Sequence, residues 1–391
     1  MTAHGSVVKS SAANLPHSIV CVVGARPNFM KMAPIMAALS KIGPKLTVHL
    51  VHTGQHYDAA MNHQYFEALG IPQPDVNLEV GSGSHAIQTA EVMRRFEPVL
   101  DERLPSAVLV VGDVNSTLAC ALVAKKKGIP VIHVEAGLRS FDRAMPEEIN
   151  RVLTDQMSDL LFTTERSGRE NLLREGIADT RIQFVGNVMI DTLRRNLPNA
   201  IPVAQILKNA GNEAFLNNQL GYAVLTLHRP SNVDDADTLR TLLETILIIS
   251  AKLPVIFTLH PRTRSMIEKF GLSAMLETPN LLLLPPQGYL EMLGLMQGAR
   301  LVLTDSGGIQ EETTALGVPC ITLRNNTERP ITVDEGTNTV AGQDPARILA
   351  AFKEVMRGEG KAGRVPEYWD GQASTRIAAA ISVWLESGQV V

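Results

Sequence analysis

The chain has 391 residues, more than one ordinary hydrophobic core accommodates, so we expect two domains. Apolar residues make up 45% of it and charged residues 19%, which is typical of a soluble globular protein. The formal net charge of −4 argues against a dedicated nucleic-acid binder, which would carry a basic stripe.

The N-terminal segment is polar and small, and no apolar core of signal-peptide length precedes Ile19. No apolar run approaches the ~18 residues needed to cross a bilayer. We therefore expect a cytoplasmic protein with a disordered N-terminal tail and no membrane partner. Cys21, Cys120 and Cys320 each lie among apolar neighbours, which predicts buried free thiols and no cysteine-based metal site.

Short apolar runs alternate with longer amphipathic stretches from Ser18 almost to the end. Near-continuous apolar runs are typical of strands buried on both faces of a parallel sheet, and the stretches between them are long enough for helical crossovers. The first series of predicted strands is Ile19–Gly24, Leu46–Thr53, Ala107–Gly112, Val131–Glu135, Leu160–Thr164 and Ile182–Gly186. The second series is Ala223–His228, Val255–His260, Leu281–Pro285, Leu301–Asp305, Cys320–Leu323 and Thr337–Val340.

This order predicts two doubly wound α/β domains. The first sheet ends near Gly186 and the second begins near Gly221, with Pro198 and Pro202 in the segment between them. The C-terminal tail from Ser374 has a helical pattern and can pack against either domain.

Unusual polar and glycine residues follow the predicted strands rather than being scattered along the chain. Ligands of open parallel sheets bind outside the carboxyl ends of the strands. Two such domains facing each other would bring both sets of loops to one cleft. These loops begin at Gly24, Thr53, Gly112, Glu135, His228, His260, Gln287, Asp305 and Arg324.

The segment from Asp305 to Glu312 has the features of an anion site. Gly307 and Gly308 let the backbone approach a ligand, Ser306 adds a hydroxyl, and a helix starting near Ile309 would direct free N–H groups at a diphosphate. Glu312 has the right chemistry to accept the hydroxyls of a ribose. An ordinary strand-to-helix turn with Ser306 as N-cap explains the same residues without a ligand.

Arg26, Lys31 and Arg329 have the charge to complete the neutralisation of a diphosphate. A lone arginine is more often a solvated surface residue, and only the shared position of these residues at strand ends favours the functional interpretation. Arg26 and Pro27 stand where a dinucleotide fingerprint needs glycines, so no NAD site is predicted here.

Asp113, Glu135, Glu147 and His228 are the candidates for proton chemistry. Asp113 and Glu135 each come at the end of an apolar strand, where a carboxylate needs a charge partner or has a functional role. Three local alternatives stay open: Asp113 as a helix cap, Glu147 as a first-turn acid paired with Arg151, and His228 as a structural residue.

Taken together, these segments resemble the non-hydrolysing UDP-N-acetylglucosamine 2-epimerases from Val22 to the last helix. The matching motifs are Gly24-Ala25-Arg26-Pro27 with Lys31-Met32-Ala33-Pro34, His133-Val134-Glu135-Ala136-Gly137-Leu138-Arg139, Pro146-Glu147-Glu148-Ile149-Asn150-Arg151, Thr304-Asp305-Ser306-Gly307-Gly308-Ile309-Gln310-Glu311-Glu312 and Thr327-Glu328-Arg329-Pro330.

The resemblance implies a GT-B-like α/β architecture of two Rossmann-like domains facing a cleft. The N-terminal domain would comprise residues 18–188 with a returning helix at 372–391, and the UDP-binding domain residues 189–371. The implied substrate-binding residues are Arg26, Lys31, Gln287, Met292, Ser306, Gly307, Gly308, Glu312 and Arg329, with Gln287 near the uracil. The implied catalytic residues are Asp113, Glu135, Glu147 and His228, in a homodimer that needs no cofactor or metal and supplies a precursor for surface polysaccharide.

The implied reaction is inversion at carbon 2 of UDP-N-acetylglucosamine. That hydrogen is not acidic, so one route expels UDP as a carboxylate removes the proton, leaves 2-acetamidoglucal, and re-adds UDP with a proton on the opposite face. Such a route needs acid and base groups on both faces and positive charge at the departing UDP.

Two departures from many bacterial members stand out. Gln55-His56-Tyr57 replaces Gln-His-Arg, and His228-Arg229-Pro230-Ser231 replaces His-Arg-Arg-Glu, which puts allosteric activation by substrate in doubt. The alternatives are an epimerase for a modified UDP-2-acetamido sugar, a hydrolysing epimerase, a UDP-sugar glycosyltransferase and a non-catalytic sensor.

Overall fold

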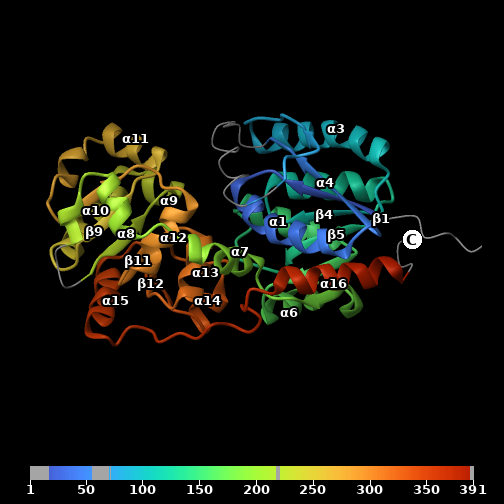
Figure 1. The fold of residues 1–391 in the computed structure, drawn as a ribbon. Coiled ribbons are helices and arrows are strands. Elements are labelled where there is room, and N and C mark those ends of the chain that lie inside the picture. The colour runs from blue at the N-terminus through green and yellow to red at the C-terminus, as the bar shows by residue number, and fades with distance from the viewer. Residues whose placement is uncertain (1–16, 55–69, 71, 217–220, 388–391) are drawn as a thin grey trace, which may run out of the picture. The chain divides into compact units, whose positions relative to one another are not determined.

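The computed structural model describes residues 17–54, 70, 72–216 and 221–387 (Figure 1). Two parallel sheets with intervening helices make up this part of the chain, so the predicted α/β class with two Rossmann-like sheets is confirmed. All twelve predicted strands are present, most of them ending one or two residues earlier than expected. The strands stop where the backbone turns, so the polar residues that follow lie in the loops.

The first sheet contains seven strands in the order β3-β2-β1-β4-β5-β6-β7. Its strands are β1 (His17–Val23), β2 (Leu46–His52), β3 (Val76–Asn77), β4 (Ala107–Val111), β5 (Val131–Ala136), β6 (Leu160–Thr163) and β7 (Ile182–Phe184). The short edge strand β3 was not predicted from the sequence. It pairs parallel to the end of β2, with Val76 opposite Val51.

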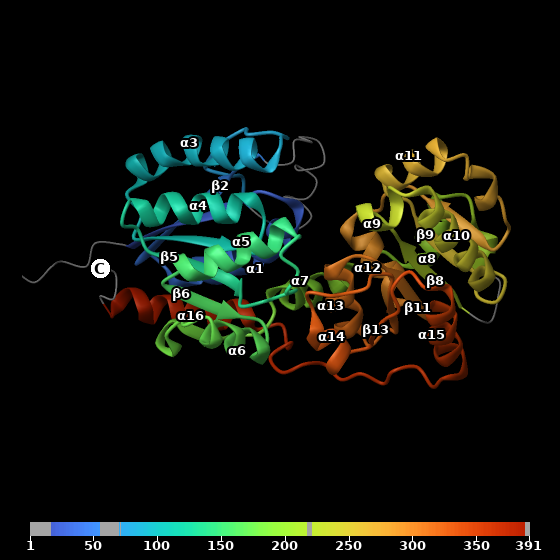
Figure 2. The ribbon, with the colours of Figure 1, turned by 180° about the vertical axis from the view of Figure 1, so that it is seen from behind.

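Helices alternate with these strands, and all but the last of them lie in crossover connections. They are α1 (Arg26–Leu39), α3 (His85–Arg103), α4 (Asn115–Lys126), α5 (Pro146–Met157), α6 (Arg166–Arg174) and α7 (Val188–Asn196). The helices α3 and α4 lie side by side in both views (Figures 1 and 2). Both pack on the sheet through a core that includes Phe96, Cys120 and Val110. All three cysteines are buried and unpaired, as predicted.

The second sheet contains six strands in the order β10-β9-β8-β11-β12-β13. Its strands are β8 (Ala223–Thr226), β9 (Val255–Thr258), β10 (Leu281–Leu284), β11 (Leu301–Thr304), β12 (Cys320–Thr322) and β13 (Asn338–Val340). Two separate apolar cores cover its faces, which explains why its strands are apolar throughout.

The helices around the second sheet are α8 (Val203–Asn209), α9 (Pro230–Val233), α10 (Ala236–Ser250), α11 (Pro261–Lys269), α12 (Tyr289–Gln297), α13 (Gly307–Leu316), α14 (Pro330–Asp334) and α15 (Pro345–Arg357). The chain ends in α16 (Ala373–Glu386), as the helical pattern of the tail predicted. No helix among the described residues is long and apolar enough to cross a membrane.

The chain divides into two compact units that do not coincide with the two sheets. One unit holds the described residues up to Val134, Leu153–Leu160 and the tail from Thr375. The other holds Glu135–Val152 and Leu161–Ser374. The domain limits expected at residues 188 and 372 stay a prediction.

Candidate functional site

The turn after β11 leads directly into α13. The helix begins at Gly307, two residues earlier than predicted, and Ser306 occupies its N-cap position. The Ser306 side chain makes no capping hydrogen bond, and its backbone N–H donates to Thr304 Oγ1 at 3.0 Å. The structure therefore places Ser306 at the N-cap, as the ligand-free alternative expected, but without a capping hydrogen bond from its hydroxyl.

The two glycines at this helix start meet different surroundings. A Cβ added to Gly307 would lie 2.6 Å from Glu328 Oε1, so packing within the protein favours glycine there. A Cβ added to Gly308 would meet no heavy atom within 4 Å. No contact made by the described residues requires a glycine at 308, which leaves room for a ligand to approach the backbone.

Glu312 lies further along α13 and is buried. Burial raises the pKa of Tyr289, and the charge and hydrogen bond of Glu312 raise it further. Gln287, before α12, is half-buried and its Nε2 donates to Pro285 O at 2.8 Å. Met292 on α12 is also half-buried and packs against the core of this unit. Of these predicted nucleotide contacts, Met292 also contributes to the packing of the hydrophobic core.

His228 follows β8 and is oriented by a buried carboxylate. Its Nδ1 lies 2.9 Å from Asp305 Oδ1, and Asp305 has no exposed surface. The backbone N–H groups of His228 and Arg229 each donate to Asp305 Oδ2 at 2.9 Å, and Asn232 Nδ2 does so at 3.0 Å. Burial alone would raise the pKa of Asp305, but the hydrogen bond and charge of His228 and these N–H groups lower it. The His228 ring is thereby fixed with Nδ1 inward, and its side chain keeps 34% of its surface exposed.

Arg329 joins two carboxylates in the interior. Its Nη2 donates to Glu135 Oε1, and its Nε lies 2.8 Å from Glu311 Oε1. Asn187 Nδ2 donates to the same Glu311 oxygen at 2.9 Å. Two predicted residues, Glu135 and Arg329, are thus in direct contact although 194 positions separate them. Glu311 stood in the resembling motif, but nothing in the sequence marked it as the partner of Arg329.

The backbone at Glu135 is unusual. Its φ is +76°, a left-handed conformation that is costly for a residue with a side chain. Gly137 follows with φ +79°, and a Cβ there would lie 2.3 Å from Gly168 O, so only glycine fits. Strained non-glycine residues concentrate at functional sites, which supports Glu135 as a site residue.

At the start of α5 the structure corrects the predicted ion pair. Arg151 Nη1 lies 2.6 Å from Glu148 Oε2, whereas the sequence had indicated Glu147 as its partner. Glu148 is buried and also accepts hydrogen bonds from the backbone of Ser140 and Phe141. The neighbouring Glu147 is half-buried in the first turn of the helix. Glu147 is thus a first-turn acid as predicted, but the ion pair predicted for it is made by Glu148.

Three predicted residues lie in the other unit. Asp113 is half-buried after β4 and directly precedes Val114, the N-cap position of α4. Lys31 is buried on α1, whose first residue is Arg26. Asn28 was not predicted to have a role. It accepts from the N–H groups of Gly24 and Ala25 and donates to Val111 O at 3.0 Å, which ties the first loop to β4.

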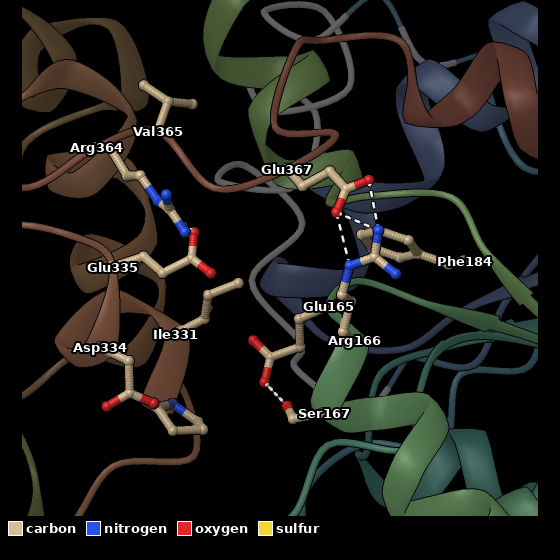
Figure 3. Close-up of a pocket in the computed structure, with 11 residues that line it drawn as sticks. Glu165, Arg166, Ser167, Phe184, Ile331, Asp334, Glu335, Arg364, Val365 and Glu367 are labelled. Carbon is tan, nitrogen blue, oxygen red and sulfur yellow. Dashed lines mark hydrogen bonds and ion pairs between the residues drawn. The ribbon is translucent and has the colours of Figure 1, made fainter.

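A cavity of about 580 Å³ lies in the unit that holds the second sheet (Figure 3). Glu165 lines it, is 2% exposed and accepts a hydrogen bond from Ser167, as Figure 3 shows. Burial raises the pKa of Glu165 to about 7, a rise that Ser167 and Arg329 oppose and that Glu311 and Asp334 reinforce. Sequence reasoning missed Glu165, although it lies two residues after the end of β6, where the strand-end rule applies.

The remaining charges around this cavity are mostly compensated. Arg166 pairs with Glu367 at 2.6 Å, and Arg364 pairs with Glu335 at 3.1 Å (Figure 3). No group of three or more metal-ligating side chains was found among the described residues.

Together, two Rossmann-like sheets with polar residues after their strands are typical of α/β enzymes. Comparison with known proteins identifies the family. The family model described as UDP-N-acetylglucosamine 2-epimerase matches residues 39–382. The chain belongs to the UDP-N-acetylglucosamine 2-epimerase family and is an isomerase.

Relatives and solved structures agree. The UDP-N-acetylglucosamine 2-epimerases of Methanocaldococcus jannaschii and Methanococcus maripaludis are 43% and 42% identical, over 92% and 89% of this chain and 98% and 97% of theirs. The UDP-2,3-diacetamido-2,3-dideoxy-D-glucuronate 2-epimerase of Pseudomonas aeruginosa is 41% identical over 92% of this chain and 98% of its own. The crystal structure of the Methanocaldococcus jannaschii enzyme in complex with UDP-GlcNAc and UDP superimposes with a TM-score of 0.82, at 42% identity over 94% of this chain and 99% of that one.

Proposed function

We propose that the chain interconverts UDP-N-acetylglucosamine and UDP-N-acetylmannosamine without hydrolysing them. The observation that carries this proposal is the open space at Gly308, at the N-terminus of α13, where N–H groups suit a diphosphate. The bound UDP-GlcNAc and UDP in the Methanocaldococcus jannaschii relative support the same ligand class for this chain.

The proposed reaction is elimination of UDP and its re-addition to 2-acetamidoglucal. A carboxylate removes the proton from C2 as the bond from C1 to the UDP oxygen breaks, and the electron pair forms the C1–C2 double bond. Re-addition forms the C1–oxygen bond again while a proton arrives at C2 from the opposite face. Atoms and charge balance without a cofactor.

We assign the proton steps to Asp113, Glu135 and Glu147, without fixing which face each serves. His228 and Arg26 stabilise the leaving phosphate, and UDP contacts come from Lys31 and the second sheet. The resemblance carries these roles, and two features support them. Asp305 holds the His228 ring in one orientation, and the Glu135 backbone is strained. The second-sheet contacts are Gln287, Met292, Ser306, Gly307, Gly308, Glu312 and Arg329.

The test is incubation with UDP-N-acetylglucosamine alone in deuterated water. Epimerisation without an acceptor should place deuterium at C2 and reach an equilibrium of two UDP-sugars, read by NMR and mass spectrometry. Free N-acetylmannosamine with UDP would show a hydrolysing enzyme instead. Absence of exchange would contradict the proposal and leave a glycosyltransferase or a sensor.

A second candidate substrate is a modified UDP-2-acetamido sugar. The Pseudomonas aeruginosa relative, named for UDP-2,3-diacetamido-2,3-dideoxy-D-glucuronate, is nearly as identical as the archaeal enzymes. Comparing kcat/KM for the two UDP-sugars decides between them. A ratio of 100 or more in favour of the diacetamido sugar would replace our first choice.

We also propose a cytoplasmic homodimer that serves surface-polysaccharide synthesis, on the family resemblance; light scattering of the purified protein tests its oligomeric state. Gln55-His56-Tyr57, on which the doubt about allosteric activation depends, lies outside the described residues. Sigmoidal dependence of rate on UDP-N-acetylglucosamine would contradict our expectation of simple kinetics.

A further inference from the structure

A fully buried histidine and aspartate hold the backbone beside Asp113. His133 on β5 and Asp155 on α5 both have no exposed surface. His133 Nδ1 lies 2.7 Å from Asp155 Oδ1, and His133 Nε2 lies 2.9 Å from the carbonyl oxygen of Gly112. All three residues lie within one compact unit.

The chemistry of these atoms determines where the protons lie. A carbonyl oxygen only accepts, so Nε2 carries a hydrogen and donates it to Gly112. One further proton is shared between Nδ1 and Oδ1, either as imidazolium with carboxylate or as imidazole with carboxylic acid. In both cases the pair is neutral overall and the ring has a single orientation.

Burying this pair in the interior of the sheet costs desolvation free energy. A buried ionisable pair recovers its desolvation cost poorly, and apolar residues of similar volume often stabilise as well or better. The neighbouring positions of β5, such as Val131 and Ile132, are apolar. An orienting role is therefore a better explanation of His133 and Asp155 than added stability.

The pair acts on the peptide group that precedes Asp113. Gly112 has φ +69°, and its N–H donates to Val134 O at 3.1 Å while its carbonyl accepts from His133. Both polar groups of Gly112 are thus bound by consecutive residues of β5. The carbonyl of Gly112 and the N–H and Cα of Asp113 belong to one planar peptide, so holding this carbonyl also holds the Cα from which the Asp113 side chain extends.

The same two residues belong to segments that carry other proposed acids. Glu135 lies two positions after His133 on β5, and Glu147 lies in the first turn of the helix that holds Asp155. We propose that His133 and Asp155 are positioning residues for epimerisation, and that they aim Asp113 by fixing the Gly112 carbonyl. This inference depends on the function proposed above.

Three variants test it. His133→Phe keeps much of the volume and removes the bond to Gly112. Asp155→Ala leaves the imidazole without its orienting partner. Asp155→Asn can donate from its amide to Nδ1, which keeps Nε2–H on the Gly112 carbonyl, so it should rescue. Val131→Ala is the matched control, because it removes buried methyl groups from the same strand and leaves the pair intact.

The readouts are kcat and KM per folded molecule, UDP affinity by calorimetry and the melting temperature. We expect kcat to fall about tenfold or more in His133→Phe and Asp155→Ala, since small misplacements of a reacting group cost up to about a hundredfold. UDP affinity should stay within about twofold in both. Asp155→Asn should keep most of its kcat, and Val131→Ala should lose stability but not kcat.

Wild-type kcat in either disrupting variant would overturn the inference and leave the proposed function intact. A loss of kcat in Val131→Ala in proportion to its loss of stability would also overturn the inference and leave the proposed function intact. If His133→Phe does not fold, the comparison of Asp155→Ala with Asp155→Asn decides alone, and equal kcat values in those two overturn the inference. Failure of the wild type to exchange deuterium at C2 would instead overturn the proposed function.

Discussion

At the scale of single residues, long-range contacts change what a side chain does. Arg329 is a proposed UDP contact, and the structure shows that it also pairs with Glu135 and Glu311. A guanidinium between two carboxylates offsets their mutual repulsion and holds them close together. This contact orients the Glu135 carboxylate that we propose as a base, at a residue whose backbone is itself strained.

Replacing Glu135 by Gln removes the base and keeps the shape. We expect turnover and deuterium incorporation at C2 to fall at least a thousandfold, on the order of general base loss combined with lost orientation. UDP binding, measured by calorimetry, should be retained because Arg329 loses a competing carboxylate. Glu367→Gln, in the exposed pair with Arg166, is the control and should keep its activity. Turnover surviving in Glu135→Gln would remove Glu135 from the mechanism.

Glu165 makes stability depend on pH. Its pKa is raised by burial to about 7, so the folded state holds a proton that the unfolded state releases above about 4.5. The contribution of this bound proton to the free energy of unfolding is fully present below about pH 4.5 and is lost as the pH rises through about 7. We expect the free energy of unfolding, measured in urea, to fall by at most on the order of 3 kcal/mol across this pH range.

The variant Glu165→Gln cannot ionise and should flatten this dependence. Glu367→Gln, which lines the same cavity, should keep the wild-type slope. An unchanged slope in Glu165→Gln would show that another group is responsible.

At the scale of secondary-structure elements, a substitution at the start of α13 should affect UDP binding and the stability of the fold in opposite directions. Glycine is unfavourable in a helix relative to alanine by about 1 kcal/mol, and no atom near Gly308 would clash with an added methyl group. The glycine thus has a cost and no benefit within the described protein. A ligand that binds against the backbone at Gly308 would explain why a glycine is present there.

The variant Gly308→Ala should therefore bind UDP about tenfold or more weakly while its melting temperature stays the same or rises. Calorimetry and thermal unfolding measure the two effects separately. Ser306→Ala is an informative companion, because its hydroxyl does not cap the helix and its loss should weaken UDP binding without destabilising the fold. Wild-type UDP affinity in Gly308→Ala would place the diphosphate elsewhere.

At the scale of the whole molecule, ligand binding and folding are linked. A ligand that binds only the native state stabilises it by about 2.7 kcal/mol at a hundred times its Kd. We expect UDP to raise the melting temperature of the wild type by several degrees, read by calorimetry. Gly308→Ala should show a smaller rise at the same UDP concentration. Adenosine diphosphate is the control, and an equal rise with it would contradict recognition of the uridine.

The sequence by itself determined the architecture and the family. Twelve strands were predictable because parallel strands buried on both faces are nearly continuous apolar runs, a pattern that needs no knowledge of partners. The family followed from long motifs in a fixed order. The loops after the strands could also be located, because the carboxyl ends of parallel strands are where ligands bind.

Only the tertiary structure decided which charged groups meet. Arg151 pairs with Glu148 rather than Glu147, and Arg329 meets Glu135 across 194 positions. The roles of His133 and Glu165 also depend on neighbours brought together by folding. Periodicity and propensity are local, whereas ion pairs, proton sharing and burial are set by residues distant in the chain, so no local pattern specifies them.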